Sequence, residues 1–119
     1  MLIRFIRPDF EFENDAGSLT QLVHEGWKQV NVILSRLGSV RGGHYHKFNE
    51  EGFYIVSGSF TLTVWNHDEK EQYEIRSGDM FVIPRHVFHT FAYHEDTTLV
   101  SLYSNGVELS PTEKDIWTE

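Results

Sequence analysis

The sequence of 119 residues contains no cysteine, which excludes disulfide bonds, thiolate nucleophiles and cysteine-type zinc sites. Basic residues are scarce: 10 Lys and Arg stand against 18 Asp and Glu, giving a formal net charge of −8. Because nucleic acids and anionic membranes are bound by concentrated basic surfaces, we expect neither as a partner. No apolar run reaches the roughly 20 residues that span a bilayer, and residues 1–15 lack the features of a signal peptide. We therefore expect a cytoplasmic protein.

Helix-type periodicity is also weak throughout the chain. Only residues 18–27 could form a turn or two of helix, and an extended conformation fits them at least as well. Instead, turn residues separate β-type runs at spacings of roughly 8–12 residues; these runs are 30–37, 53–66 with a break at Ser57–Gly58, 72–79, 80–84, 87–93 and 97–104. The pattern predicts one all-β domain over residues 1–119, a small antiparallel β-barrel or jelly roll. We expect the polar tail, residues 110–119, to pack loosely or to cap one end.

Histidine is present in mild excess, with seven residues. His44 and His46 should face the same side of a strand because strand side chains alternate. If that strand pairs with the next one, Glu51 joins them at one interior point. Two histidines on a strand are often only exposed polar residues, but residues 78–93 predict a second hairpin that can add another imidazole. Three histidines and one carboxylate suit divalent Mn, Fe, Co, Ni or Zn, with one or two positions left open for water or substrate.

These residues carry a family resemblance. The order Gly38-x5-His44-x-His46-x4-Glu51-x6-Gly58 resembles the first sequence motif of the cupins, and Gly78-x5-Pro84-x-His86-x2-His89 resembles the second. The departures are His86, where that motif usually has Gly, and Tyr93, where it often has Asn.

The cupin resemblance implies a jelly-roll barrel and four metal ligands: His44, His46, Glu51 and His89. Glu50 falls one residue short of the motif spacing and should face outward. His86 would line the mouth of the site.

Residues 15–20, 41–47 and 103–108 are further similar to cupins that act on nucleotide-linked keto-sugars. These are the sugar 3,4-ketoisomerases and the cupin domain of a capsular sugar-nucleotide reductase/epimerase. Ala16 departs from the Arg common in that group, and Glu51 departs from the metal-free ketoisomerases. The resemblance implies isomerisation or epimerisation of a small polar or sugar-type substrate through a metal-stabilised enolate.

The candidates for proton transfer in such a reaction are His86 and Tyr103. Arg41 and Arg36 are candidates for phosphate contacts because a guanidinium binds phosphate with two hydrogen bonds; their alternative is to be solvated surface residues. Two other functions remain open: a non-haem iron dioxygenase, and a small-ligand-binding cupin without turnover. We also expect a homodimer, because the apolar N-terminal segment (Leu2, Ile3, Phe5, Ile6) could extend or exchange into a partner's sheet.

Overall fold

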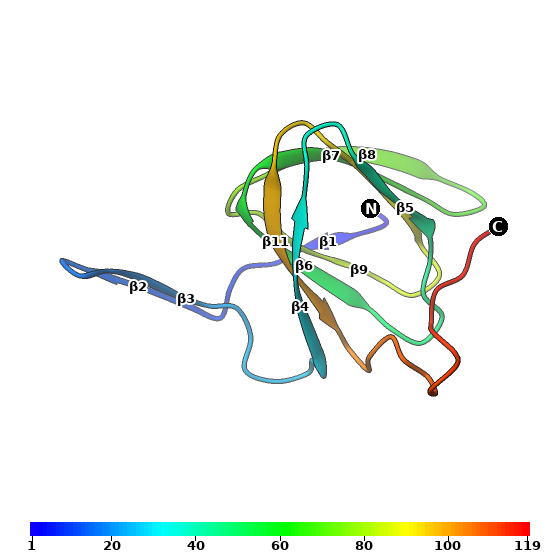
Figure 1. Ribbon diagram of the computed structural model, residues 1–119, viewed down its shortest axis with the longest axis horizontal. Helices are drawn as coiled ribbons and strands as arrows, with labels where there is room; N and C mark the ends of the chain where they lie inside the picture. The colour runs from blue at the N-terminus through cyan, green and yellow to red at the C-terminus, as the bar shows by residue number, and fades with distance from the viewer.

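The computed structural model describes residues 1–119 and consists of eleven β-strands joined by loops, with no helix (Figure 1). The strands are β1 (Arg4–Phe5), β2 (Phe10–Asn14), β3 (Gly17–Gln21), β4 (Gln29–Ser35), β5 (Val40–His44), β6 (Glu51–Ser57), β7 (Ser59–Trp65), β8 (Lys70–Arg76), β9 (Met80–Ile83), β10 (Phe88–Tyr93) and β11 (Thr97–Tyr103). It follows that no helix is available to cross a membrane. The all-β prediction is confirmed, and the break predicted at Ser57–Gly58 separates β6 from β7.

Two antiparallel sheets form the body of the molecule and face each other as a jelly roll (Figure 1). One sheet has the strand order β1-β9-β6-β11-β4, and the other has the order β5-β10-β7-β8. Strand β7 alternates strictly between buried and half-buried positions, so that Phe60, Leu62 and Val64 all point inward. They join a hydrophobic core of 13 buried residues that lies between the sheets. Burial of this apolar surface is the main source of folding free energy.

The strand pairing predicted around the histidines is wrong. Strand β5 pairs with β10, whereas β6 pairs with β11 and β9, so the strands that carry His44 and Glu51 belong to opposite sheets. Strands β9 and β10 are likewise in different sheets and do not form a hairpin. Alternation in a sequence gives the face that a side chain takes, but it does not identify the partner strand. The two connections, residues 45–50 and 84–87, therefore each cross from one sheet to the other.

Residues 10–21 form a β2–β3 hairpin that projects away from the two sheets (Figure 1). Of the segment 18–27, residues 18–21 lie in β3 and are extended, in agreement with the second of the two predicted alternatives, while residues 22–27 form a loop. All ten strand residues of the hairpin are exposed. Strand β1 pairs with β9 of the same chain, so the hairpin, rather than the predicted N-terminal strand, is the segment without a partner in this subunit.

The polar tail does not pack loosely. Asp115 is completely buried, and the backbone of Trp117 pairs with that of Tyr45 in an isolated antiparallel bridge. The tail therefore caps the end of the sandwich at which residues 45–50 cross between the sheets.

Candidate metal centre

Three histidines gather at the end of the sandwich where the crossing loops lie. One ring nitrogen from each of His44, His46 and His89 lies within 4.8 Å of those of the other two. His44 and His89 are opposite each other in the β5–β10 ladder, and their ring centroids are 4.6 Å apart. His46 follows β5 in the crossing loop, with its ring 5.1 Å from that of His44. The sequence prediction that His44 and His46 project together is confirmed.

A β-bulge at Gly43 sets the direction of the β5 side chains. His44 and Gly42 oppose the consecutive residues His89 and Thr90, so Gly43 is an extra residue in the ladder. Because of this extra residue, Arg41 and His44 both line the interior although they are three positions apart. Strict alternation would have placed them on opposite faces.

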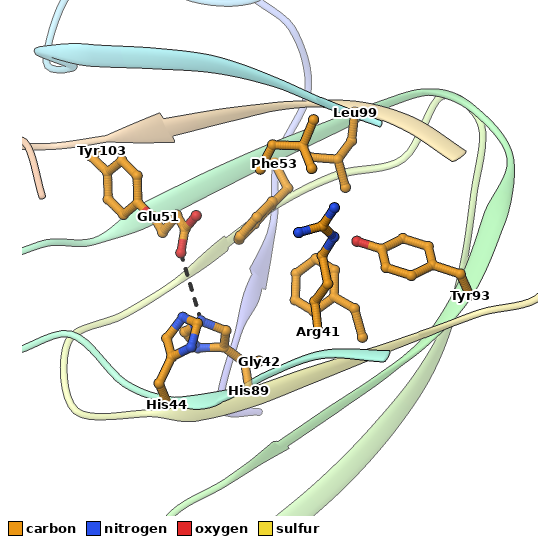
Figure 2. Close-up of a pocket in the computed structure, with 11 residues that line it drawn as sticks. Arg41, Gly42, His44, Glu51, Phe53, His89, Tyr93, Leu99 and Tyr103 are labelled. Carbon is orange, nitrogen blue, oxygen red and sulfur yellow. Dashed lines mark ion pairs between the residues drawn. The ribbon is translucent and has the colours of Figure 1, made fainter. Parts of the chain in front are cut away.

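Glu51 approaches the histidines from the opposite sheet. Its Oε1 atom lies 2.9 Å from Nε2 of His46. The same atom lies 3.7 Å from Nε2 of His89, the contact marked by the dashed line in Figure 2. Its Oε2 atom accepts a hydrogen bond of 2.7 Å from the Ser101 hydroxyl on β11. Glu50, by contrast, points away and forms an ion pair with Arg4 at 2.9 Å. The structure therefore separates the two adjacent glutamates as the motif spacing predicts.

Backbone carbonyls orient two of the three imidazoles. Nδ1 of His46 lies 2.5 Å from the carbonyl oxygen of Asp115, and Nδ1 of His89 lies 3.2 Å from that of Val87. A carbonyl only accepts hydrogen bonds, so each Nδ1 carries the proton and Nε2 is directed toward the centre. Metal-binding histidines commonly have such a partner on the nitrogen that does not bind the metal.

The charge states of the site follow from burial and from Glu51. Burial lowers the pKa of His89 to about 4 and also lowers that of His44, which keeps both rings neutral near pH 7. Burial opposes the charge on His46 too, but the hydrogen bond to Glu51 outweighs it and raises the His46 pKa. Burial likewise works to raise the pKa of Glu51, and the hydrogen bond from His46 with the nearby histidines holds it below its usual range.

These residues fit a divalent cation. The two ring nitrogens of His46 face two acceptors, the Asp115 carbonyl and the Glu51 carboxylate, so the ring is a cation in this arrangement. The buried Glu51 carboxylate therefore needs a positive charge at this position to be stable. A divalent ion supplies that charge as a proton does. The neutral imidazoles of His44 and His89 complete a nitrogen-rich donor set of the kind that Zn, Fe, Co, Ni and Mn accept.

A cavity of about 400 Å³ opens beside the histidines. Figure 2 shows the Arg41 guanidinium and the Tyr93 hydroxyl directed toward each other at the end of the cavity away from Glu51. Arg41 is held by the Ser35 hydroxyl at 2.8 Å and the Leu34 carbonyl at 3.3 Å. The lining residues are Ile33, Arg41, Gly42, His44, Glu51, Phe53, His89, Phe91, Tyr93, Leu99 and Tyr103.

Tyr103 lies at the metal end of this cavity, with its ring edge-on to His46 at a centroid distance of 5.3 Å. Burial raises the pKa of its phenol well above the usual value, and the negative charge of Glu51 adds to the effect. Tyr103 is therefore a protonated hydrogen-bond donor at every physiological pH.

Two of the residues singled out from the sequence do not reach the cavity. The His86 side chain lies in a separate hollow with Tyr45 and Phe88, although its backbone N–H donates to the His46 carbonyl at 2.8 Å. Its φ of +69° explains why glycine is usual at this turn position. Arg36 is exposed in the turn between β4 and β5. The assignments of His86 to proton transfer and of Arg36 to phosphate binding gain no support from these positions.

Sequence reasoning did not identify three residues of the site. Ser101, which donates to Glu51, carries no local signal beyond its alternation in β11. Tyr93, which faces Arg41, stands out in the sequence only as a departure from the second cupin motif, and that departure assigns it no role in the site. Asp115 lies in a polar tail, and no pattern there indicates that its carboxylate is buried.

We expect Glu51→Gln to weaken metal binding at least about 10-fold, because it removes a negative charge that faces two of the histidines. Glu50→Gln is the matched control. It breaks a partly exposed ion pair with Arg4, and such pairs contribute roughly 0–1 kcal/mol, so its metal content should stay at the wild-type level. Metal analysis after dialysis measures both variants. An equal loss in the two would show that the wrong glutamate has been assigned.

Comparisons with known proteins agree with this geometry. The family model of the cupin domain matches residues 36–104. A 3-hydroxyanthranilate 3,4-dioxygenase from Burkholderia cenocepacia is 33% identical over 66 residues, which cover 54% of this chain and 37% of that protein. The chain spans only 20% to 38% of the length of the curated relatives that it matches.

Two solved structures illustrate the shared fold. QdtA, a sugar 3,4-ketoisomerase from Thermoanaerobacterium thermosaccharolyticum in complex with TDP, matches with a TM-score of 0.80 at 20% identity, covering 99% of this chain and 88% of that one. The capsular polysaccharide assembling protein CapF from Staphylococcus aureus matches with a TM-score of 0.67 at 24% identity, covering 92% of this chain and 32% of that one. The matched family model, the jelly roll and the histidine cluster together identify the chain as a member of the cupin family.

Proposed function

We propose that the protein is a divalent-metal cupin that moves a proton beside the carbonyl group of a small polar, sugar-type substrate, in an isomerisation or epimerisation. The observation that carries this proposal is the cavity itself, which brings a histidine–glutamate donor set, a protonated phenol and a buttressed guanidinium to one space. The structural likeness to a sugar 3,4-ketoisomerase supports the substrate class. A nucleotide-linked keto-sugar is the first substrate to test.

The residues of the chain divide the work between the two ends of the cavity. Arg41, fixed by Ser35 and Leu34, binds an anionic or oxygen-rich part of the substrate. Tyr103 is protonated before the reaction, and it offers this proton to a substrate oxygen on which negative charge develops. The apolar walls, which include Phe53, Phe91 and Leu99, exclude bulk water from the reacting carbon.

The metal would be held by His44, His46, His89 and Glu51. When bound there, a Zn, Fe, Mn, Ni or Co ion supplies Lewis acidity that polarises a carbonyl oxygen.

Solvent-isotope exchange tests the proposed reaction. The protein, loaded in turn with each of the five metals, is incubated in D₂O with a nucleotide-linked 4-keto sugar, and deuterium at the carbon beside the ketone is followed by NMR. We expect wash-in without oxygen uptake. Tyr103→Phe should slow it by roughly 10²- to 10⁴-fold, the usual contribution of a general acid, while metal content is unchanged. Wash-in at the wild-type rate in Tyr103→Phe would remove the tyrosine from the mechanism.

A non-haem iron dioxygenase is the second candidate, and the match to a 3-hydroxyanthranilate 3,4-dioxygenase supports it. Three histidines and one glutamate also leave positions open for dioxygen on ferrous iron. Oxygen consumption that requires Fe²⁺ and a substrate, with no deuterium wash-in, would select this function. Metal binding with neither activity across a broad substrate panel would favour a ligand-binding cupin without turnover.

We also propose that the protein is a homodimer in which the β2–β3 hairpin lies against the outer face of the partner's five-stranded sheet. An isolated two-stranded hairpin is marginally stable in water, and this one exposes Phe10, Phe12 and Leu19. The edge strand β4 exposes a matching apolar row, Val30, Val32 and Leu34. Both surfaces would be covered by such a contact.

Val32→Glu should convert the dimer to a monomer in sedimentation equilibrium, because it places a charge in the centre of the apolar row on β4. His67→Glu adds the same side chain at the exposed β7–β8 turn and should leave the dimer intact. A wild-type monomer at micromolar concentration, or a Val32→Glu dimer of wild-type affinity, would contradict this arrangement.

A further inference from the structure

The loop that carries His46 is held by the C-terminal tail and not by a sheet. His46 lies beyond the end of β5 and before the start of β6, so neither ladder fixes its backbone. The backbone N–H groups of the next two residues in the loop point to the carboxylate of Asp115. Apart from the hydrogen bond that the His46 carbonyl accepts from the His86 N–H, the tail therefore supplies the contacts that fix this ligand on its crossing loop.

The Asp115 carboxylate is buried and all of its contacts are donors. Each oxygen accepts two hydrogen bonds, from Lys47 N at 2.8 Å and Trp117 Nε1 at 2.7 Å on Oδ1, and from Phe48 N at 2.9 Å and Asn49 Nδ2 at 2.9 Å on Oδ2. A charge taken out of water is costly unless it is satisfied in this way. Four donors converging on one carboxylate fix the loop and the tail in a single relative position.

The same residue also contacts the ligand directly. The carbonyl oxygen of Asp115 accepts the Nδ1 proton of His46, which leaves Nε2 of that ring facing Glu51. The side chain of Asp115 thus holds the loop, and its main chain fixes the orientation of the imidazole by accepting the Nδ1 proton. On the other side of the loop, Trp117 pairs with the Tyr45 backbone, and the Lys47 ammonium lies 3.7 Å above the indole ring.

We propose that Asp115 is a positioning residue for the metal ligand His46, and that the C-terminal tail sets both the affinity and the coordination geometry of the centre. This inference rests on the proposed metal site. It assigns a function in the site to a segment some seventy residues away in sequence that touches neither the metal position nor the cavity.

Zinc affinity and the Co²⁺ spectrum test this role. Asp115→Asn places an amide N–H₂ group against two N–H donors, so the loop must shift. We expect Zn²⁺ affinity, measured by competition with a chromophoric chelator, to fall roughly 10- to 100-fold, as when the hydrogen-bond partner of a metal ligand is lost. The visible absorption of the Co²⁺-loaded protein should change as well, because it reports ligand geometry and not the amount of folded protein.

Trp117→Phe serves if Asp115→Asn does not fold, since it removes one of the four donors and keeps an aromatic ring. It should show a smaller loss of affinity in the same direction, with a changed Co²⁺ spectrum. Glu113→Gln is the control, an identical chemical change at an exposed residue of the same tail. Unfolding of the metal-free proteins is measured alongside to separate affinity from stability.

Wild-type affinity and an unchanged Co²⁺ spectrum in a folded Asp115→Asn or Trp117→Phe protein would overturn the positioning role and leave the metal site standing. A wild-type protein that binds no Zn²⁺ or Co²⁺ would overturn both. Equal losses in Glu113→Gln and Asp115→Asn would also contradict the role, because they would trace the effect to the charge of the tail.

Discussion

His89→Ala is expected to abolish stoichiometric metal binding. His89 is 2% exposed, and burial holds its pKa at about 4, so at neutral pH its Nε2 offers a lone pair directed at the centre. Losing only the hydrogen-bond partner of a ligand costs roughly 10- to 100-fold in affinity, so removal of the ligand itself should exceed about 100-fold. Equilibrium dialysis followed by metal analysis measures the effect, with circular dichroism to establish that the barrel is folded.

His86→Ala is the matched control for this variant. It removes an imidazole that lies three residues earlier and outside the cavity. The backbone strain of the positive φ, +69°, is similar before and after the substitution, because histidine and alanine are both L-residues with a Cβ atom. Metal content should be unchanged, whatever the effect on turnover. If His89→Ala retained the wild-type stoichiometry, or if both variants lost metal equally, the three-histidine centre would be the wrong interpretation.

Gly42→Ala is expected to be the most destabilising single change near the site. A Cβ at this position would lie 2.4 Å from the His89 carbonyl oxygen and 2.9 Å from the Thr90 Cα, and the φ of +115° is one that L-residues rarely adopt. Backbone strain contributes about 1–3 kcal/mol and overpacking against backbone atoms about 1–3 kcal/mol. We therefore expect a loss of roughly 2–6 kcal/mol in the free energy of unfolding, measured by chemical denaturation, and weaker metal binding because β10 must move.

Gly43→Ala separates the two causes. Gly43 also has a positive φ, +77°, but a Cβ added there, on the outside of the bulge, would meet no atom within 4 Å. Only the conformational cost of about 1–2 kcal/mol applies at this position. Equal losses in Gly42→Ala and Gly43→Ala would mean that close packing of β5 on β10 does not constrain the site.

The sequence predicts which side chains share a face but not which strands meet. Phe60, Leu62 and Val64 alternate with polar residues, and β7 lies where that alternation places it. His44 and Glu51 do converge, yet through opposite sheets, because the pairing of distant strands depends on the whole topology. The motif spacing selected Glu51 over Glu50 without knowledge of the strand pairing. Glu51 begins β6 and Glu50 immediately precedes it, so the choice depends only on which way each side chain points.

The features of the site that could not be predicted from the sequence depend on single contacts between residues far apart in the chain. Arg41 faces the cavity only because Gly43 is an extra residue in β5, and a bulge has no hydrophobic signature. The tail looked solvated by composition, and only its contacts with residues 45–49 reveal the buried Asp115. His86 illustrates the opposite error: its proximity in sequence to His89 suggested a shared site, but the turn at residues 85–86 directs its side chain into a separate hollow.

The arrangement of donors across the two sheets has a consequence for motion. His44 and His89 belong to one sheet and Glu51 to the other, so a bound ion would join the two layers at the end where the crossing loops and the C-terminal tail lie, while the apolar core joins them elsewhere. Chelation should therefore leave the barrel folded but let that end open more often. Removal of the ion should accelerate amide hydrogen exchange in β5, β6 and β10 together. The free energy of local opening should fall by at most the stabilisation that the bound ion gives, which is about 2.7 kcal/mol at a metal concentration one hundred times Kd. Local opening of the sandwich would then report occupancy of the site without any knowledge of the substrate.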